Sequence, residues 1–159
     1  MSKKITTYTH THLHSSAGSF LDGVGKCEEY MQRAVELGQQ AICITEHGSM
    51  ASAYEFQSQG DKYGIKTILG NEMYCVEDRF RKGVTEAEKE GLTPTEVREE
   101  NRKRLKAPHL LLLAETDEGL QNLYRLNYYA NNEGFYGKPR IDLNLLAKYS
   151  KGLLSLIHI

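Results

Sequence analysis

Strand-like and helix-like segments alternate along the first half of the chain, and this order limits the possible folds. The strand-like segments are short apolar runs such as QAICITEHG. The helix-like segments carry apolar side chains at helical spacing and end at a glycine. The expected elements are a strand at 4–10, a helix at 26–38, a strand at 40–48, a helix at 50–64 and a strand at 65–76. A β-α-β-α-β order predicts a mostly parallel sheet or barrel with crossover helices.

Residues 77–107 interrupt this alternation. They are rich in charges of both signs and poor in apolar residues. Two capping boxes, which begin at Thr85 and Thr93, predict one or two short helices. We therefore expect an exposed insertion without a core of its own. Beyond it, the expected elements are a strand at 109–115, helices at 116–132 and 142–150, and a strand at 152–159.

Charge and cysteine content exclude several classes of protein. The formal net charge of −1 creates no global basic field, so contact with nucleic acid requires a local patch or another part of a longer protein. Three widely spaced cysteines form no disulfide framework, and Cys43 is expected to be buried in its apolar strand. No signal-peptide core and no run of about 20 apolar residues is present. We expect a cytoplasmic protein without membrane contact.

Histidines are concentrated near the start of the chain. Three of the six fall within five residues, at His10, His12 and His14. Alternate residues of an extended strand share one face. Imidazoles packed on one face repel each other when protonated, so a bound metal ion would explain the crowding. We expect His12 and His14 to be ligands, whereas His10 is the weaker candidate.

Further candidate ligands lie at strand ends, where parallel α/β folds form their sites. Asp22 lies in the loop after the histidines, His47 ends the strand at 40–48, and Glu72 ends the regular part of the next strand. His109 precedes its own strand, so it reaches the same place only if EMYCV and HLLLLA pair antiparallel.

The donor types indicate the chemistry of this predicted site. Imidazole and carboxylate ligands without cysteine suit Zn²⁺, Mn²⁺ or Fe²⁺. Four histidines and two carboxylates exceed the needs of one tetrahedral ion, so a multinuclear site is expected, with Glu72 able to bridge two ions. Two ions about 3.5–4 Å apart can hold a hydroxide and clamp a phosphate ester, which predicts metal-assisted phosphoester hydrolysis. Glu46 is either a surface acid or a residue that orients a ligand.

Four motifs in order, HLHS…LDG, ITEHG, ILGNE and HLLLLAE, resemble the metal-binding motifs of the polymerase and histidinol phosphatase (PHP) family. The resemblance implies a distorted (β/α)7 barrel with a cluster of divalent ions. YGIKTILGNEMY and GLQNLYRLNYYANNEGFYGKPRID are similar to one branch, the N-terminal domain of bacterial or phage DNA polymerase III alpha subunits. The resemblance covers about residues 8 to 154. Carried over by position, the family's metal ligands fall on His12, His14, Asp22, His47, Glu72 and His109.

Three departures from the family pattern accompany this resemblance. One extra residue separates His14 from Asp22, and Glu46 replaces the usual aspartate. The family's late ligands, a cysteine near the position of Ile159 and an Asp-x-His motif beyond it, are missing. His158 could substitute, but we expect the tail SLIHI to be a truncated or foreign end. Residues 1–159 are therefore expected to be a PHP-domain fragment, cut before the barrel closes, with the polymerase domains downstream.

The resemblance implies a function for the longer parent protein. The parent would be a replicative DNA-directed DNA polymerase that uses Mg²⁺ and contacts DNA, other polymerase domains and replisome subunits. Its PHP site would resemble a metal-dependent phosphoesterase or 3′–5′ exonuclease. Two alternatives are a stand-alone phosphatase of the histidinol phosphatase type and a non-catalytic, metal-binding structural domain.

Overall fold

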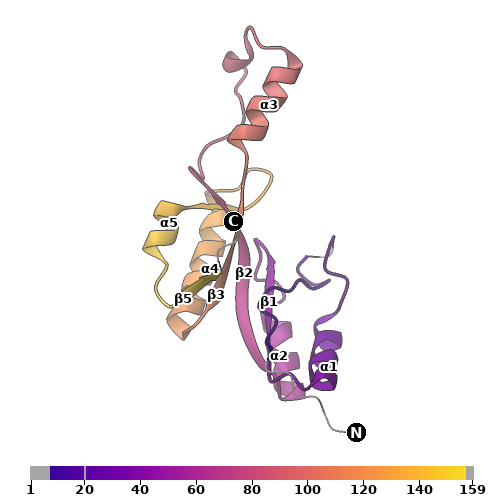
Figure 1. The fold of residues 1–159 in the computed structure, drawn as a ribbon. Coiled ribbons are helices and arrows are strands. Elements are labelled where there is room, and N and C mark those ends of the chain that lie inside the picture. The colour runs from indigo at the N-terminus through magenta and orange to yellow at the C-terminus, as the bar shows by residue number, and fades with distance from the viewer. Residues whose placement is uncertain (1–7, 20, 157–159) are drawn as a thin grey trace.

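The computed structural model describes residues 8–19 and 21–156. These residues form one mixed sheet with helices beside it (Figure 1). The elements in chain order are α1 (Cys27–Leu37), β1 (Ala41–His47), α2 (Ala53–Tyr63), β2 (Lys66–Val76), the 3-10 helix η1 (Ala87–Lys89), α3 (Pro94–Arg104), β3 (His109–Ala114), α4 (Asp117–Asn132), β4 (Arg140–Asp142), α5 (Leu143–Lys148) and β5 (Leu153–Leu156). In the described ranges, no helix is long and apolar enough to span a bilayer.

The predicted α/β class is confirmed, but the sheet is not mostly parallel. β1 and β2 pair in parallel, whereas β2 with β3, and β3 with β5, pair antiparallel. The reason is that no crossover helix joins β2 to β3. Both strands instead flank the charged insertion, which lets the chain reverse direction. The sheet is open over the residues described, as expected for an incomplete barrel.

The short strand β4, which the sequence did not predict, extends the line of β1. Tyr74 in β2 pairs with both His109 of β3 and Arg140 of β4. A strand has only two edges, so β4 lies on the edge that β1 occupies further back along β2. The β1 pairing ends at His47 opposite Glu72. The end of β1 and the start of β4 therefore meet near the middle of this edge.

The segment before α1 runs along β1 without forming a regular strand. The backbone N–H groups of Cys43 and Thr45 donate to the carbonyls of His10 and Leu13, at 3.0 and 2.8 Å. The Leu13 N–H donates to the Thr45 hydroxyl at 3.0 Å. Residues 8–10 of the predicted strand are therefore extended but not ladder-paired, and residues 4–7 lie outside the described residues.

The core lies between the sheet and the helices beside it. Its largest fully buried side chains include Met31 of α1, Phe56 of α2 and Met73 of β2. Leu123 and Leu126 of α4 join the same cluster. Cys43 is fully buried as predicted, and burial raises the pKa of its thiol to about 12. The three cysteines are free, so the expected absence of a disulfide framework is confirmed.

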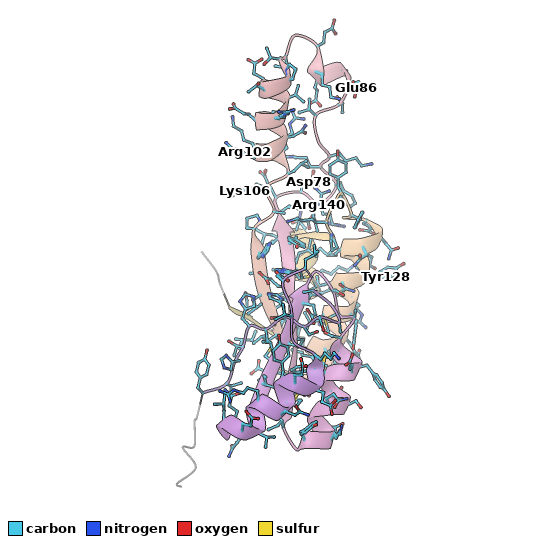
Figure 2. All side chains as sticks on the ribbon, turned by 90° about the vertical axis from the view of Figure 1, so that its right-hand side faces the viewer. Asp78, Glu86, Arg102, Lys106, Tyr128 and Arg140 are labelled. Atoms are coloured by element: carbon cyan, nitrogen blue, oxygen red, sulfur yellow. The ribbon has the colours of Figure 1, made fainter. Side chains whose placement is uncertain are left out.

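Residues 77–107, which we call the arm, project from one end of the sheet, away from α1 and α2 (Figures 1 and 2). Both predicted capping boxes are confirmed. Glu88 accepts from the Thr85 backbone at 2.8 Å, and Glu96 accepts from the Thr93 backbone at the same distance. α3 buries no residue, which agrees with the prediction of an exposed insertion without a core.

A buried arginine fixes the base of the arm. The Arg140 guanidinium is 3% exposed and donates to the carbonyls of Arg79, Arg81 and Gly134, each at 2.9 Å. Arg79 in turn donates to both oxygens of Asp142, at 3.0 and 2.8 Å. Asp142 also caps α5 by accepting from the Leu145 N–H. The arm is thereby attached to β4 and α5 at its root, near the labelled Asp78 and Arg140 in Figure 2.

Candidate metal centre

The structure brings all six predicted ligands together at one place. Two come from the extended segment beside β1, one from the loop before α1, and one each from β1, β2 and β3. The predicted antiparallel pairing of β2 and β3 is confirmed, and it explains how the first residue of β3 reaches the ends of the other strands. The six residues are His12, His14, Asp22, His47, Glu72 and His109. Their role as ligands remains a prediction.

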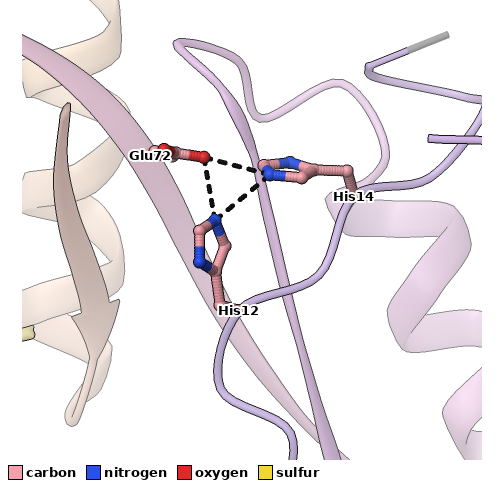
Figure 3. Close-up of side chains that lie close together, drawn as sticks. All are labelled: His12, His14 and Glu72. Atoms are coloured by element: carbon pink, nitrogen blue, oxygen red, sulfur yellow. Dashed lines mark hydrogen bonds and ion pairs between the residues drawn. The ribbon is translucent and has the colours of Figure 1, made fainter. Parts of the chain in front are cut away.

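The Glu72 carboxylate is the centre of this cluster. Its side chain is 5% exposed. The Oε2 atom lies 2.9 Å from His12 Nε2 and 3.0 Å from His14 Nε2, as Figure 3 shows. The other oxygen, Oε1, contacts His109 Nδ1. One carboxylate thus faces separate histidines with its two oxygens, which is the geometry of a bridging ligand.

His47 faces a carboxylate with each of its ring nitrogens. Nε2 lies 2.7 Å from Asp22 Oδ2, and Nδ1 lies 3.2 Å from Glu72 Oε2. His47 is the last residue of β1 and pairs directly with Glu72 across the ladder, which fixes their approach. The His47 ring also stacks on His14, with ring centroids 4.1 Å apart.

The donor atoms fall into three overlapping groups in which all members lie within 4.8 Å of one another. The groups are His12, His14 and Glu72; His14, Asp22 and His47; and His47, Glu72 and His109. Each group mixes imidazole nitrogen with carboxylate oxygen, the donor set that divalent Zn, Mn and Fe accept. Side-chain chemistry and spacing therefore suit divalent cations.

Hydrogen bonding within the cluster shifts the pKa values of its members in the direction that metal binding requires. Burial alone would raise the pKa of Glu72, but hydrogen bonds from His12 and His109 outweigh it and the net pKa lies below the ordinary value. The hydrogen bond from His47 lowers the pKa of Asp22. Burial, followed by the neighbouring His47, lowers the pKa of His14. Ionised carboxylates and a neutral imidazole are the ligand forms of these groups.

Two buried nitrogen atoms indicate that the cluster fits a cation. His14 Nδ1 and His47 Nδ1 are buried without a hydrogen-bond partner. When His47 donates its Nε2 proton to Asp22, the lone pair on Nδ1 faces the Glu72 oxygen at 3.2 Å. Two electron pairs at that distance repel each other, and a buried polar atom without a partner is costly. A divalent cation between them would remove both penalties.

Glu46 does not contact the candidate ligands. It is 1% exposed, so the prediction of a surface acid is wrong. Its carboxylate accepts from the Ser15 backbone N–H at 3.2 Å, from the Ser15 hydroxyl, and from the Ser52 hydroxyl at 2.7 Å. Because Ser15 follows His14, this carboxylate holds the backbone next to a candidate ligand.

Some residues near the cluster differ from what the sequence indicated. His10 is exposed and joins none of the three groups, in line with its weaker prediction. His158 lies outside the described residues. Tyr74 was not identified from the sequence, yet its ring packs edge-on against His109 at 4.7 Å and stacks on His47 at 6.2 Å between centroids. Only the register of β2 against β3 places Tyr74 there.

Comparison with known proteins gives the class of this domain. The chain belongs to the PHP domain family, whose model matches residues 10–158. Similar curated proteins are DNA polymerase III alpha subunits. That of Aquifex aeolicus is 39% identical over 94% of this chain and 12% of its own length. Those of Helicobacter pylori and Treponema pallidum are 35% and 36% identical over 96% and 94% of this chain, and 11% and 12% of their own lengths.

The chain therefore spans about 12% of the length of these curated relatives. Among solved structures, a candidate metal-dependent phosphoesterase from Bifidobacterium adolescentis is similar over 80% of this chain and 34% of its own, at 14% identity and a TM-score of 0.47.

Proposed function

We propose that this chain is the N-terminal PHP domain of a replicative DNA polymerase III alpha subunit, and that its cluster hydrolyses phosphoesters as a 3′–5′ exonuclease. Residues 1–159, with the arm at 77–107, would form part of that domain, and the polymerase domains would follow. The similarity to polymerase alpha subunits along 94% of the chain supports the proposal that the longer protein is such a subunit. DNA and replisome subunits would then be its partners, in the cytoplasm, and the parent polymerase would use Mg²⁺.

The observation that carries the hydrolytic proposal is the central position of Glu72 among four histidines. A neutral imidazole has one free lone pair, so each histidine serves one ion at a time. Two ions would use every histidine once: His12, His14 and Glu72 would hold one, and His47, Glu72 and His109 would hold the other. We assign Zn²⁺, Mn²⁺ or Fe²⁺ to these positions from the donor chemistry.

Asp22 has a separate role in this arrangement. It accepts from His47 Nε2 and so fixes the tautomer that leaves Nδ1 free to face Glu72. In its own group, with His14 and His47, Asp22 would itself be a ligand, but an ion there would take the two imidazoles assigned above to the other ions. Divalent ions held here would supply a hydroxide at neutral pH and neutralise the negative charge of a phosphoester. The protein's own contribution is to orient four imidazoles toward one carboxylate.

The test is His47→Ala in the full-length protein that carries this domain, with His10→Ala as the matched control. His10 is exposed and outside the three groups, so its loss removes an imidazole without touching the cluster. Release of a labelled 3′ nucleotide from a mismatched primer is measured with and without a chelator, beside primer extension and bound-metal content. We expect His47→Ala to abolish chelator-sensitive release and leave extension intact.

Two outcomes would contradict the proposal. A wild-type protein that binds metal but releases no nucleotide supports a structural domain instead of a nuclease. Loss of extension together with digestion in His47→Ala shows that the cluster stabilises the fold, and the catalytic role would then lack support.

A further inference from the structure

A lysine that follows a left-handed glycine stands beside the metal cluster. In the turn at 134–139, just before β4, Gly137 has a φ of 70°, and the Tyr136 N–H donates to the Lys138 carbonyl at 3.1 Å. The next residue, Pro139, packs so closely on Gly48 that a Cβ at Gly48 would lie 2.5 Å from its ring. Gly48 directly follows His47, so this turn is seated against the end of β1.

The Lys138 ammonium lies over an aromatic ring that touches two candidate ligands. Its Nζ is 4.4 Å from the centroid of the Tyr74 ring. That ring packs against His109 and stacks on His47. The face of an aromatic ring attracts a cation, so Tyr74 holds the ammonium at this position. In residues 8–19 and 21–156, no carboxylate forms an ion pair with Lys138.

Lys138 is exposed, and its positive charge would lie near any divalent ions bound in the cluster. The distance from Nζ to the His109 ring is at most the sum of 4.4 and 4.7 Å. This range is within about the Debye length of 8–10 Å, so divalent ions in the cluster would repel the ammonium. An anion that contacts both the ions and the lysine removes this repulsion. Lysine binds phosphate as a point charge on a flexible stem, and a phosphoester is the substrate class of the proposed function.

We propose that Lys138 is a substrate-binding residue that contacts a non-bridging oxygen of the phosphoester held at the metal cluster. The proposal rests on the proposed function and adds a residue to it. Tyr74 is the positioning residue that keeps the ammonium on the side of the cluster formed by His47 and His109. Lys138 donates a hydrogen bond and offsets negative charge, and it transfers no proton.

The experiment compares Lys138→Met with Lys148→Met in the full-length, metal-loaded protein. Lys148 is the matched control, because it ends α5 and its Nζ lies 5.2 Å from the ring of the next residue, Tyr149, away from the cluster. Binding of inorganic phosphate is measured by calorimetry, bound metal by elemental analysis, and KM and kcat by nucleotide release. We expect Lys138→Met to weaken phosphate binding and raise KM by about 10–100-fold, the effect of one charge-assisted hydrogen bond, with bound metal unchanged.

Lys138→Arg, which retains the charge, should recover most of the phosphate affinity, whereas Lys148→Met should match the wild type. Wild-type phosphate affinity in a folded Lys138→Met protein that hydrolyses its substrate overturns this inference and leaves the proposed function standing. Loss of bound metal in Lys138→Met also overturns it, since the lysine would then support the cluster itself. A wild-type protein that binds neither metal nor phosphate overturns both.

Discussion

The arm and the metal cluster are both rich in charged side chains, but they satisfy those charges in opposite ways. Beyond the base of the arm, most charged partners are near in sequence: Thr85 with Glu88, Lys89 with Glu86, and Arg104 with Glu100. In the cluster, Glu72 contacts His12 from 60 residues away and His109 from 37. Charges at the tip of the arm are thus neutralised by neighbours on the surface, whereas cluster groups converge from five parts of the chain and still leave two buried nitrogen atoms without hydrogen-bond partners. Polar side chains that converge from distant parts of the chain and leave buried nitrogen atoms without partners distinguish a candidate site from a solvated charged surface.

The largest effect should come from removing the carboxylate at the centre of the cluster. Glu72→Ala deletes the carboxylate that belongs to two of the three groups and contacts all four histidines. We expect the affinity for divalent metal to fall by more than about 100-fold. This loss exceeds the 10–100-fold that is typical of residues that only orient ligands. Elemental analysis after dialysis measures this. Glu77→Gln is the control, because that carboxylate is 82% exposed and its only ion pair within residues 8–19 and 21–156 is with Arg81. Equal metal loss in both variants would refute the contrast between the two regions.

The next effect concerns the root that joins the two regions. Asp142→Asn removes the charge that holds Arg79 and leaves that guanidinium, 15% exposed, without its closest partner. We expect the free energy of unfolding to fall by about 1.5–3 kcal/mol, the range for hydrogen bonds to a charged group, because Glu133 still pairs with Arg79 at 2.9 Å. A urea titration followed by circular dichroism measures it, and bound metal should not change. A destabilisation below about 0.5 kcal/mol would show that the root is held by other contacts.

The same pair makes a pH-dependent contribution to stability. Burial alone would raise the pKa of Asp142, but hydrogen bonds from the Leu145 N–H and from Arg79 outweigh it, so the folded pKa lies below the ordinary value of about 3.9. The contribution is therefore present above that value and is lost as the pH falls through the folded pKa. The gap in unfolding free energy between wild type and Asp142→Asn should narrow below about pH 4. A gap that stays constant from pH 7 to pH 3 would contradict this assignment.

A smaller effect is expected at Glu46, which supports the cluster without touching it. Glu46→Gln keeps one oxygen acceptor but faces the two serine hydroxyls and the Ser15 N–H with an amide. The backbone next to His14 should loosen, and metal affinity should fall by about 10–100-fold. Titration with Mn²⁺ measures the affinity. An affinity equal to the wild type would show that the Ser15 backbone is held without this carboxylate.

The smallest effect belongs to the arm. Thr93→Ala removes the residue whose hydroxyl caps α3 by accepting from the Glu96 N–H. The expected cost is about 1 kcal/mol, confined to the arm helix. Hydrogen exchange of α3 amides should rise, whereas bound metal and phosphate affinity should not change. A change in metal content would show that the arm and the cluster are coupled.

Residue patterns in the sequence were sufficient to identify the local elements and the candidate ligands. Each capping box joins two residues that are three positions apart, so both arm helices could be predicted from the sequence alone. The histidines and carboxylates stood at strand ends, where register has little freedom. Strand direction was only partly accessible, because the antiparallel pairing of β2 and β3 depends on how the chain returns after the arm, and the sequence indicated it only as the condition for His109 to reach the site. β4 and Tyr74 were missed for the same reason: a three-residue strand has no period, and the place of Tyr74 follows from pairing with β3.

The clamp at the base of the arm has a consequence for how this domain can be altered. The Arg140 guanidinium donates hydrogen bonds to the Arg79 and Arg81 carbonyls, where the chain leaves the sheet. The Cys75 N–H donates to the Pro108 carbonyl at 2.8 Å, where the chain returns. Both ends of the arm are thus anchored at its base, so we expect the position of His109 not to depend on the residues between 81 and 108. We therefore expect the segment beyond these anchors to tolerate changes in length and sequence. Shortening or extending this segment, or inserting a reporter domain at Gly91, should leave metal binding at the cluster unchanged.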